Sequence, residues 1–462
     1  MLVYNTLSGK KDELGKPLNG RVFNLFVCGP TVYDHSHLGH ARTYIFFDAL
    51  VRYLRSRKRK VFYLQNITNI DDKIIDRAKQ ENKNPLSLAR KFEKEYLNDM
   101  KSLGIKTVNR YARASDHIPQ IEKQIKTLLE KGFAYITSGG IYFSVKKFQD
   151  YGKLSGQNID ALRVGWRIEP DPEKKDPLDF ALWKFSKDGE PAWSSPWGKG
   201  RPGWHIEDTA ITEKFFGPQY DIHGGGMDLK FPHHEAEIAQ EETISGKKPL
   251  AKIWFHTGFL LVNGEKMSKS LGNFISIKDF LKEWPAIVLR TIFLQHHYRS
   301  PVDYSLIIAE QTESSLLSIL DFLTKLDLLI KKGAKTSSNN EETIKKFSEK
   351  FNNALEDDFN TPEALATLFE LINYHQKTVW NLSKKEAKTL KRFLTESLNM
   401  LGIAFEVKIP FKIRRLANKR ELFRKDKQFI QSDALRENIL ALGYKVEDTN
   451  YGPQITPARL SR

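Results

Sequence analysis

The chain has 462 residues and carries 73 Lys and Arg against 57 Asp and Glu, which gives a formal net charge of +16. Hydrophobic residues make up 40% of it and charged residues 28%. This balance is typical of soluble globular proteins and excludes a disordered or fibrous chain. The length predicts two or more domains. No membrane span is expected, because charged residues interrupt even the leucine-rich stretch 316–330.

The chain has a single cysteine, Cys28, which excludes an internal disulfide and a zinc site built from several thiolates. The N-terminal residues lack a basic region followed by an apolar one, so we expect no secretory signal and a cytoplasmic location. The basic excess indicates either a polyanionic partner, such as nucleic acid or nucleotide phosphates, or a lysine-rich surface that favours solubility. Charge alone leaves both interpretations open.

A βαβ unit is predicted near the N-terminus. Residues 21–28 read as a buried strand, residues 41–57 show apolar side chains at helical spacing, and residues 60–67 read as a second strand. Such units form parallel sheets, in which ligands bind beyond the carboxyl ends of the strands. Cys28 lies at such an end.

Further along the chain, residues 140–210 are rich in Gly, Pro and Trp and are interpreted as an inserted subdomain. A helical pattern then runs from residue 279 nearly to the end, and residues 401–462 carry 13 Lys and Arg against 7 Asp and Glu. The other predicted segments are helices over 85–104 and 119–132, a strand over 252–256, a loop over 264–273 and a polar connector over 333–341.

Two histidines, His37 and His40, lie at the start of the first predicted helix. There, their ring nitrogens can bind a triphosphate, and the helix dipole favours its negative charge. The intervening Gly39 leaves room for a nucleotide close to the backbone. A capped helix with polar residues in its first turn is the alternative interpretation.

A second motif, Gly264-Glu-Lys-Met-Ser-Lys-Ser-Leu-Gly-Asn273, places Lys266 and Lys269 on a short loop. A loop of this kind can close over phosphates and neutralise the charge that builds up on a pyrophosphate leaving group. The alternative is a solvated loop of lysine and serine.

A third motif, His223-Gly-Gly-Gly-Met-Asp228, is followed by Phe231-Pro-His-His-Glu-Ala-Glu237. The glycines allow close approach to a nucleoside, with Asp228 accepting a hydrogen bond from a ribose or an amine. If the second segment is helical, His233 and Glu237 share a face and can reach one metal ion. A hydrogen bond between two surface side chains is the alternative.

Together, the histidine turn and the lysine loop resemble the paired signatures of class I aminoacyl-tRNA synthetases. Other segments resemble the cysteinyl-tRNA synthetase family in particular, and the resemblance covers nearly the whole chain. These segments are Val27-Cys-Gly-Pro-Thr-Val-Tyr33, Asn66-Ile-Thr-Asn-Ile-Asp-Asp-Lys73, Asp176-Pro-Leu-Asp-Phe-Ala-Leu-Trp183, Gly203-Trp-His-Ile-Glu207, the run 223–240, Tyr298-Arg-Ser300 and Asp433-Ala-Leu-Arg436.

The resemblance implies an α/β fold: a doubly wound, Rossmann-like parallel-sheet catalytic domain with an insertion, followed by an α-helical bundle and a small C-terminal domain. It also implies a monomer. The expected boundaries are 1–115 and 201–260 for the two halves of the catalytic domain, 116–200 for the insertion, 261–305 for the lysine loop and linking segment, 306–400 for the bundle and 401–462 for a basic tRNA-binding domain.

The implied reaction is activation of cysteine by ATP, accompanied by Mg²⁺, followed by transfer of the acyl group to the 3′ end of tRNA(Cys). Positioning and electrostatics would carry the catalysis. The catalytic residues would be His37, His40, Lys266 and Lys269. ATP would bind to His37, His40, Gly225, Gly226, Asp228 and Lys269, and the amino-acid pocket would contain Cys28, Thr68, Trp204 and His223.

The family uses a zinc ion, bound by two cysteines, a histidine and a glutamate, to recognise the substrate thiol. Cys28, His233 and Glu237 match three of these ligands, whereas Asp208 stands where the second cysteine is expected. A carboxylate keeps the charge of the lost thiolate and is an accepted zinc ligand. We therefore expect one zinc ion on these four residues. The alternatives are a small buried Cys28 and a solvated or helix-capping Asp208.

The basic stretch that contains Arg414, Arg415, Lys419 and Arg420 would contact the tRNA backbone, unless it is only a solvated helix face. Two other functions stay open: a ligase that joins cysteine to a small amine, and a tRNA-binding paralogue that has lost catalysis. The basic C-terminal region argues against the first, since a small acceptor needs no such surface. The intact histidine and lysine pairs argue against the second, and the aspartate at the zinc site argues for it.

Overall fold

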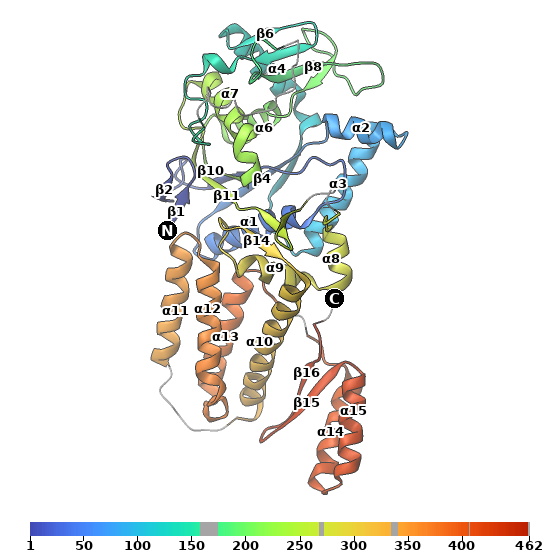
Figure 1. Ribbon diagram of the computed structural model, residues 1–462. Helices are drawn as coiled ribbons and strands as arrows, with labels where there is room; N and C mark the ends of the chain where they lie inside the picture. Colours follow the sequence, from blue (N-terminus) through green and yellow to red (C-terminus); the bar gives the residue numbers. More distant parts are fainter. Residues whose placement is uncertain (158–173, 268–271, 334–340, 406, 461–462) are drawn as a thin grey trace. The chain divides into compact units, whose positions relative to one another are not determined.

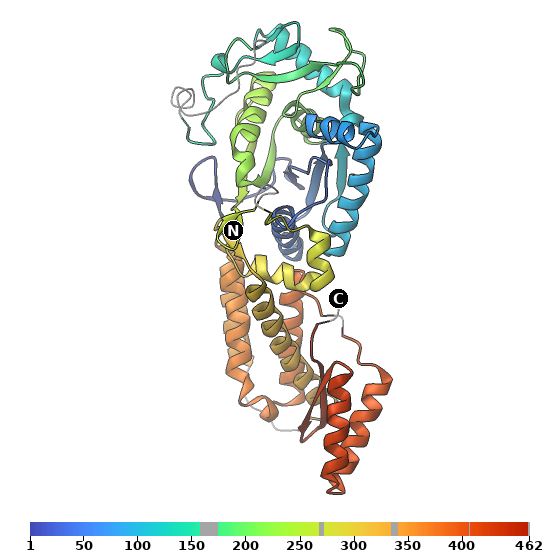
Figure 2. The same ribbon diagram turned by 45° about the vertical axis from the view of Figure 1, so that its right-hand side comes forward.

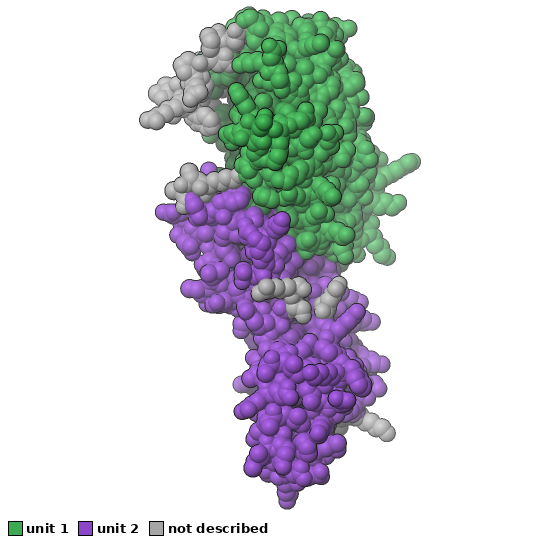
Figure 3. Space-filling view, turned by 90° about the vertical axis from the view of Figure 1, so that its right-hand side faces the viewer, with its two compact units in different colours: residues 1–259, 299–301 green, residues 260–298, 302–462 purple. Residues whose placement is uncertain are grey.

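The computed structural model describes residues 1–157, 174–267, 272–333, 341–405 and 407–460 (Figure 1). The chain divides into two compact units, Met1–Phe259 with Arg299–Pro301 and Leu260–Tyr298 with Val302–Arg462 (Figure 3). Among the described residues, no helix is both long and apolar enough to cross a membrane.

A five-stranded parallel sheet forms the centre of the first unit. In spatial order its strands are β11 (Ala251–Thr257), β10 (Tyr220–Gly226), β3 (Phe23–Val27), β4 (Val61–Ile67) and β5 (Arg110–Arg113). The chain moves outward from β3 to β5 and then returns to the other side of β3 with β10 and β11. Doubly wound sheets bind ligands at this switch point. The predicted fold class is confirmed.

Helices with side-chain caps pack on this sheet. α1 (Leu38–Ser56) follows β3 as predicted, and its N-cap is His37, whose Nδ1 accepts a hydrogen bond from the Gly39 amide. Asp71 caps α2 (Asp72–Gln80) and Asn84 caps α3 (Pro85–Ser102) with their side chains in the same way.

The remaining helices of the unit are α4 (Ile118–Glu130), α6 (Ile206–Phe216) and α7 (Glu235–Ser245). Short helical turns lie at Ala114–His117, Val145–Lys147, Met227–Leu229 and Lys230–His234.

A second sheet interrupts the parallel one between β5 and β10 and is antiparallel. Its strands are β6 (Ala134–Ile136), β7 (Gly140–Phe143), β8 (Phe180–Phe185) and β9 (Gly200–Pro202). The last strand leads through Trp204 into α6, so this segment delivers side chains to the end of the parallel sheet. An N-terminal hairpin pairs β1 (Leu2–Asn5) with β2 (Lys10–Glu13).

The second unit combines a small sheet with helices. β12 (Leu260–Val262) pairs with β13 (Glu265–Lys266) and β14 (Val302–Tyr304). The helices are α8 (Ile277–Glu283), α9 (Ala286–Leu294), α10 (Leu306–Lys332), α11 (Glu341–Glu356), α12 (Thr361–Gln376), α13 (Lys384–Met400), α14 (Phe411–Lys425) and α15 (Phe429–Ala441), with a turn at Val379–Asn381. Figures 1 and 2 show α10 to α13 side by side as a bundle. The predicted polar connector falls largely on 334–340, outside the described residues.

The C-terminal segment differs from the prediction of a helical pattern nearly to the end. β15 (Tyr444–Thr449) and β16 (Gly452–Pro457) form an antiparallel hairpin that contacts both α14 and α15. Val446 is the only buried residue of β15, and it packs with Ile413, Ala417 and Ile439. A strand with one buried side chain lacks the alternating apolar pattern that would have indicated it.

Gly224 allows β10 to pack closely on α1. In Gly224→Ala, the new Cβ would overlap the ring of Phe47, so the free energy of unfolding should fall by about 1–3 kcal/mol. Gly226→Ala on the same strand is the control, because its Cβ would meet only the movable carboxylate of Asp228. Urea unfolding measures both variants, and equal losses would contradict the packing argument.

Candidate functional site

Four elements bring predicted site residues to the carboxyl end of the parallel sheet. Cys28 follows β3, and its amide donates to the carbonyl of Gly224 on β10 at 3.0 Å. His223 lies on β10. Asp208 and Glu237 lie in the first turns of α6 and α7, where the helix dipole favours negative charge. The switch point of the sheet therefore gathers a thiol, an imidazole and two carboxylates.

The four predicted metal ligands, Cys28, Asp208, His233 and Glu237, are all buried, and their donor atoms lie within 4.8 Å of one another. Nε2 of His233 is 3.0 Å from Oδ2 of Asp208 and 3.1 Å from Oε1 of Glu237. Sγ of Cys28 is 3.7 Å from Oε1 of Glu237. We refer to these residues as the donor set. One sulfur, one nitrogen and two carboxylates suit a divalent metal such as zinc.

The donor set contains three acidic groups, and no Lys or Arg in the described part of the chain compensates their charge. Burial raises the pKa of the Cys28 thiol, and the charges of Glu237 and Asp208 raise it further. Burial and Asp208 likewise raise the pKa of Glu237. Among the described residues, no Lys or Arg pairs with these groups. Oδ1 of Asp208 has no hydrogen-bond partner there, and Oε2 of Glu237 lies 3.6 Å from Nε2 of His223. A bound cation would compensate the charge and contact these oxygens.

His233 is oriented by two neighbours from the segment before α6. Nδ1 of His205 is 2.8 Å from Nδ1 of His233. The ring of Trp204, predicted for the amino-acid pocket, stacks on His233 with centroids 4.3 Å apart. A hydrogen bond at Nδ1 of His233 fixes its Nε2 toward the carboxylates of Asp208 and Glu237.

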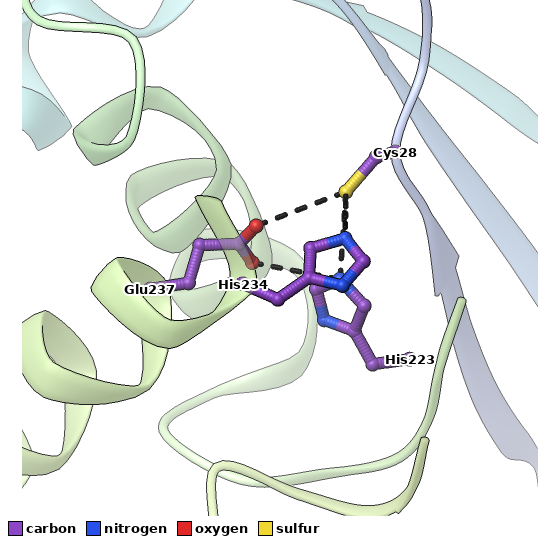
Figure 4. A group of neighbouring side chains, drawn as sticks. All are labelled: Cys28, His223, His234 and Glu237. Carbon is purple, nitrogen blue, oxygen red and sulfur yellow. Dashed lines mark hydrogen bonds and ion pairs between the residues drawn. The ribbon is translucent and has the colours of Figure 1, made fainter. Parts of the chain in front are cut away.

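Figure 4 shows a second group of donors, Cys28, His223, His234 and Glu237. This group shares Cys28 and Glu237 with the donor set. Nε2 of His223 lies 3.4 Å from Sγ of Cys28 and 3.6 Å from Oε2 of Glu237. Nε2 of His234 lies 3.1 Å from the same sulfur. Burial lowers the pKa of both histidines, so both rings are neutral at neutral pH. The hydroxyl of Tyr220, 2.7 Å from Nδ1 of His223, orients that ring.

Thr68, another predicted pocket residue, belongs to a hydrogen-bonded cluster at the end of β4. Its hydroxyl donates to Oε1 of Glu207, and the side-chain amide of Asn66 donates to the same oxygen at 3.2 Å. Oδ1 of Asn66 accepts from the Gly29 amide at 2.5 Å. The cluster therefore ties the segment after β3 to β4 and α6. Burial and the charge of Asp208 raise the pKa of Glu207.

His37 and His40 lie at the N-terminus of α1 with stacked rings, 3.8 Å between centroids. Nδ1 of His37 accepts from the Gly39 amide at 3.1 Å, and Nδ1 of His40 accepts from the His37 amide at 3.3 Å. Burial lowers the pKa of His37 to about 4 and that of His40 well below its usual range. Each ring is therefore neutral at neutral pH and carries its proton on Nε2.

The other residues predicted to bind ATP belong partly to the first unit and partly to the second. Gly225 and Gly226 end β10, and Asp228 follows them with an exposed side chain. Lys266 is exposed at the end of β13 in the second unit. Lys269 lies outside the described residues.

One of the four predicted tRNA contacts is corrected. Arg414, Arg415 and Lys419 are exposed on α14. Arg420 is 1% exposed, and its guanidinium bonds both carboxylate oxygens of Asp448 at 2.5 and 3.0 Å. This guanidinium joins α14 to β15 and is unavailable to a phosphate backbone. The sequence did not indicate the pairing, because Asp448 lies in a strand that was not predicted.

Several residues near the site were not singled out from the sequence. His205, Glu207, His234 and Asn66 lie inside the segments that carry the family resemblance, next to predicted residues. That adjacency is the signal that could have found them. Tyr220 carried no such signal, because it lies on a strand ahead of its motif.

The protein is expected to lose stability as the pH falls from about 6.5 to about 4. His37 has an ordinary pKa of 6.5 and a folded pKa of about 4, so in this window the unfolded chain binds more protons and acid favours unfolding. His37→Gln should reduce the change in the free energy of unfolding with pH by up to about 1.4 kcal/mol per pH unit. Urea unfolding at several pH values between about 4 and about 6.5 measures this pH dependence. An unchanged pH dependence in His37→Gln would contradict the assignment.

Comparison with known proteins connects this site to a family. Residues 15–314 match the family described as tRNA synthetases class I (C) catalytic domain, and residues 350–406 match a DALR domain. The chain is 45% identical over 463 residues to a cysteine–tRNA ligase of Methanococcus maripaludis strain C7, covering 96% of this chain and 97% of the relative. It is 43% identical to a cysteine–tRNA ligase of Caldicellulosiruptor saccharolyticus, covering 98% and 99%.

Solved structures share the fold at low sequence identity. Mycobacterium tuberculosis methionyl-tRNA synthetase with methionyl-adenylate has a TM-score of 0.60 at 14% identity, covering 83% of this chain and 90% of that chain. A LeuRS–tRNA–LeuAMS complex from Agrobacterium radiobacter K84 has a TM-score of 0.63 at 12% identity, covering 82% and 83%. The family match and the identity over nearly the full length show that the chain belongs to the cysteine–tRNA ligase family of class I aminoacyl-tRNA synthetases.

Proposed function

We propose that this chain is itself a cysteine–tRNA ligase, which activates cysteine with ATP and transfers it to the 3′ end of tRNA(Cys). The observation that carries the proposal is the buried donor set at the switch point of the sheet. A metal held there can bond sulfur directly, whereas a plain pocket separates a thiol from a hydroxyl poorly. Membership of the family supports adenylate formation as the first step.

ATP, accompanied by Mg²⁺, is proposed to bind near the carboxyl ends of β3 and β10. The Nε2–H groups of His37 and His40 would donate to phosphate oxygens, and the N-terminus of α1 would favour their charge. Gly225 and Gly226 would let adenosine approach the backbone, with Asp228 accepting from it. The two lysines of the 264–273 loop, Lys266 and Lys269, would neutralise the departing pyrophosphate.

One zinc ion per chain is proposed on the donor set. Three contacts, at 3.0, 3.1 and 3.7 Å, connect the four donor atoms, so these residues would be able to hold one zinc ion together. Oδ1 of Asp208, which has no hydrogen-bond partner among the described residues, supports the same assignment. When bound, zinc stabilises the thiolate form of a cysteine ligand. The pocket around the substrate would contain Cys28, Thr68, Trp204 and His223.

The tRNA backbone is proposed to contact the exposed basic face of α14 at Arg414, Arg415 and Lys419. The domain boundaries expected from the sequence, with a catalytic domain divided by the 116–200 insertion and a tRNA-binding domain over 401–462, belong to the same proposal. A monomeric state and a cytoplasmic location stay predictions.

ATP–pyrophosphate exchange driven by cysteine, with serine alongside, tests the proposed activation step. Cysteine should support exchange, and serine should be at least about a hundredfold less effective. Zinc chelation should abolish the exchange, and added zinc should restore it. Transfer of labelled cysteine to tRNA(Cys) tests the second step.

The other outcomes distinguish the alternatives. Exchange without transfer to tRNA would favour a ligase acting on a small amine. Binding of tRNA without exchange would favour a paralogue that has lost catalysis. Exchange that survives complete removal of zinc would contradict selection of the thiol by a metal.

Asp208→Asn should weaken zinc binding at least about tenfold, because an amide oxygen lacks the charge of the ligand it replaces. Asp208→Cys should keep zinc bound. Competition with a chelator, followed by metal analysis, measures both variants. Glu213→Gln at the other end of α6 is the control and should leave the affinity unchanged. Full zinc affinity in Asp208→Asn would exclude Asp208 as a ligand.

A further inference from the structure

Glu207 is a buried carboxylate with one unpaired oxygen. It is 1% exposed and lies in the first turn of α6, directly before Asp208. Its Oε1 accepts hydrogen bonds from the Thr68 hydroxyl and the Asn66 amide. Its Oε2 has no hydrogen-bond partner among the described residues. A buried acceptor left without a partner costs free energy unless a ligand supplies one.

Among the described residues, no cationic side chain forms an ion pair with Glu207, whereas the acidic groups Asp208, Asp71 and Glu237 lie close enough to act on it. A metal on the donor set would neutralise Asp208 and Glu237, but Glu207 belongs to neither group of metal donors. The missing partner is therefore a cationic hydrogen-bond donor that arrives with the ligand.

We propose that Glu207 binds the α-ammonium group of the amino-acid substrate, an inference that rests on the proposed function. Only two carbon atoms separate the ammonium nitrogen of cysteine from its sulfur. A substrate whose thiol lies at the donor set therefore keeps its ammonium group near the residue that precedes Asp208. Glu207 discriminates α-amino acids from thiols that lack an amino group.

The surroundings of Glu207 hold its carboxylate in one position. Thr68, which is proposed for the amino-acid pocket, donates to Oε1 directly. Asn66 donates to the same oxygen and is itself fixed by the Gly29 amide. Both bonds leave Oε2 as the oxygen that faces no protein donor. Such preorganisation lowers the entropy lost when a ligand binds.

The wild-type protein tests the proposal without any variant. Isothermal titration of the zinc-loaded protein with L-cysteine and with 3-mercaptopropanoate compares two thiols that differ only in the amino group. Cysteine should bind about ten- to a hundredfold more tightly, which is the effect of a charge-assisted hydrogen bond. Equal affinities would overturn the proposal.

Glu207→Gln separates the charge of the side chain from its shape. The amide can still accept from Thr68 and Asn66, but it offers an ammonium group no negative charge. Affinity for cysteine should fall to that of 3-mercaptopropanoate, while affinity for 3-mercaptopropanoate is kept. Glu241→Gln on α7 is the matched control, because Glu241 is also 1% exposed, with one oxygen bonded to Gln124 and the other unpartnered.

The readouts distinguish a positioning role from a structural one. A structural role of Glu207 would weaken the binding of both thiols equally in Glu207→Gln, and that result would overturn the proposal. Cysteine-driven exchange, measured on the same wild-type preparation, reports the proposed function by itself. Exchange together with equal binding of the two thiols would overturn the role of Glu207 alone. Absence of both exchange and cysteine binding would overturn the function and the inference together.

Discussion

Buried acidity at the end of a parallel sheet is the constraint on which the arrangement of the first unit depends. Cys28, Asp208 and Glu237 are removed from water, and the described part of the chain gives them no Lys or Arg as a partner. In their ionised forms such groups destabilise a folded protein unless a cation neutralises them. The N-termini of α6 and α7 offset part of this cost, because both helices direct their positive ends toward the acids.

The histidines around these acids form a hydrogen-bonded network that adds no positive charge beside a bound cation. Nδ1 of His234 lies 2.8 Å from Nε2 of His256, and Nδ1 of His256 lies 2.8 Å from the Thr6 hydroxyl oxygen. Burial lowers the pKa of His256 to about 3, so this network is neutral at neutral pH. Neutral rings orient one another through hydrogen bonds without adding charge of their own. A protonated histidine in their place would repel a bound cation.

Local patterns made much of the fold predictable. The helix expected over 41–57 is α1, and the strand expected over 60–67 is β4, because apolar spacing indicated both. The spacing of His233 and Glu237 indicated a shared face, and the family resemblance added Cys28 and Asp208. The pairing of Arg420 with Asp448 was not predictable, since it depends on residues that are distant in sequence. The unpaired oxygen of Glu207 is likewise visible only once its neighbours are placed.

Asp208 keeps the geometry of the donor set while changing its chemistry. The carboxylate retains the negative charge expected of a thiolate at this position, and its reach brings Oδ2 to 3.0 Å from Nε2 of His233. With one thiolate in place of two, the donor set is a harder ligand set in the hard–soft acid–base sense. Its preference among metal ions would move from soft ions that favour sulfur toward ions that accept oxygen ligands. If zinc binds there as proposed, discrimination between a thiol and a hydroxyl would depend more on the side chains around the donor set. His223 contacts the sulfur of Cys28 and Trp204 contacts the ring of His233, so these two groups would be placed to supply it.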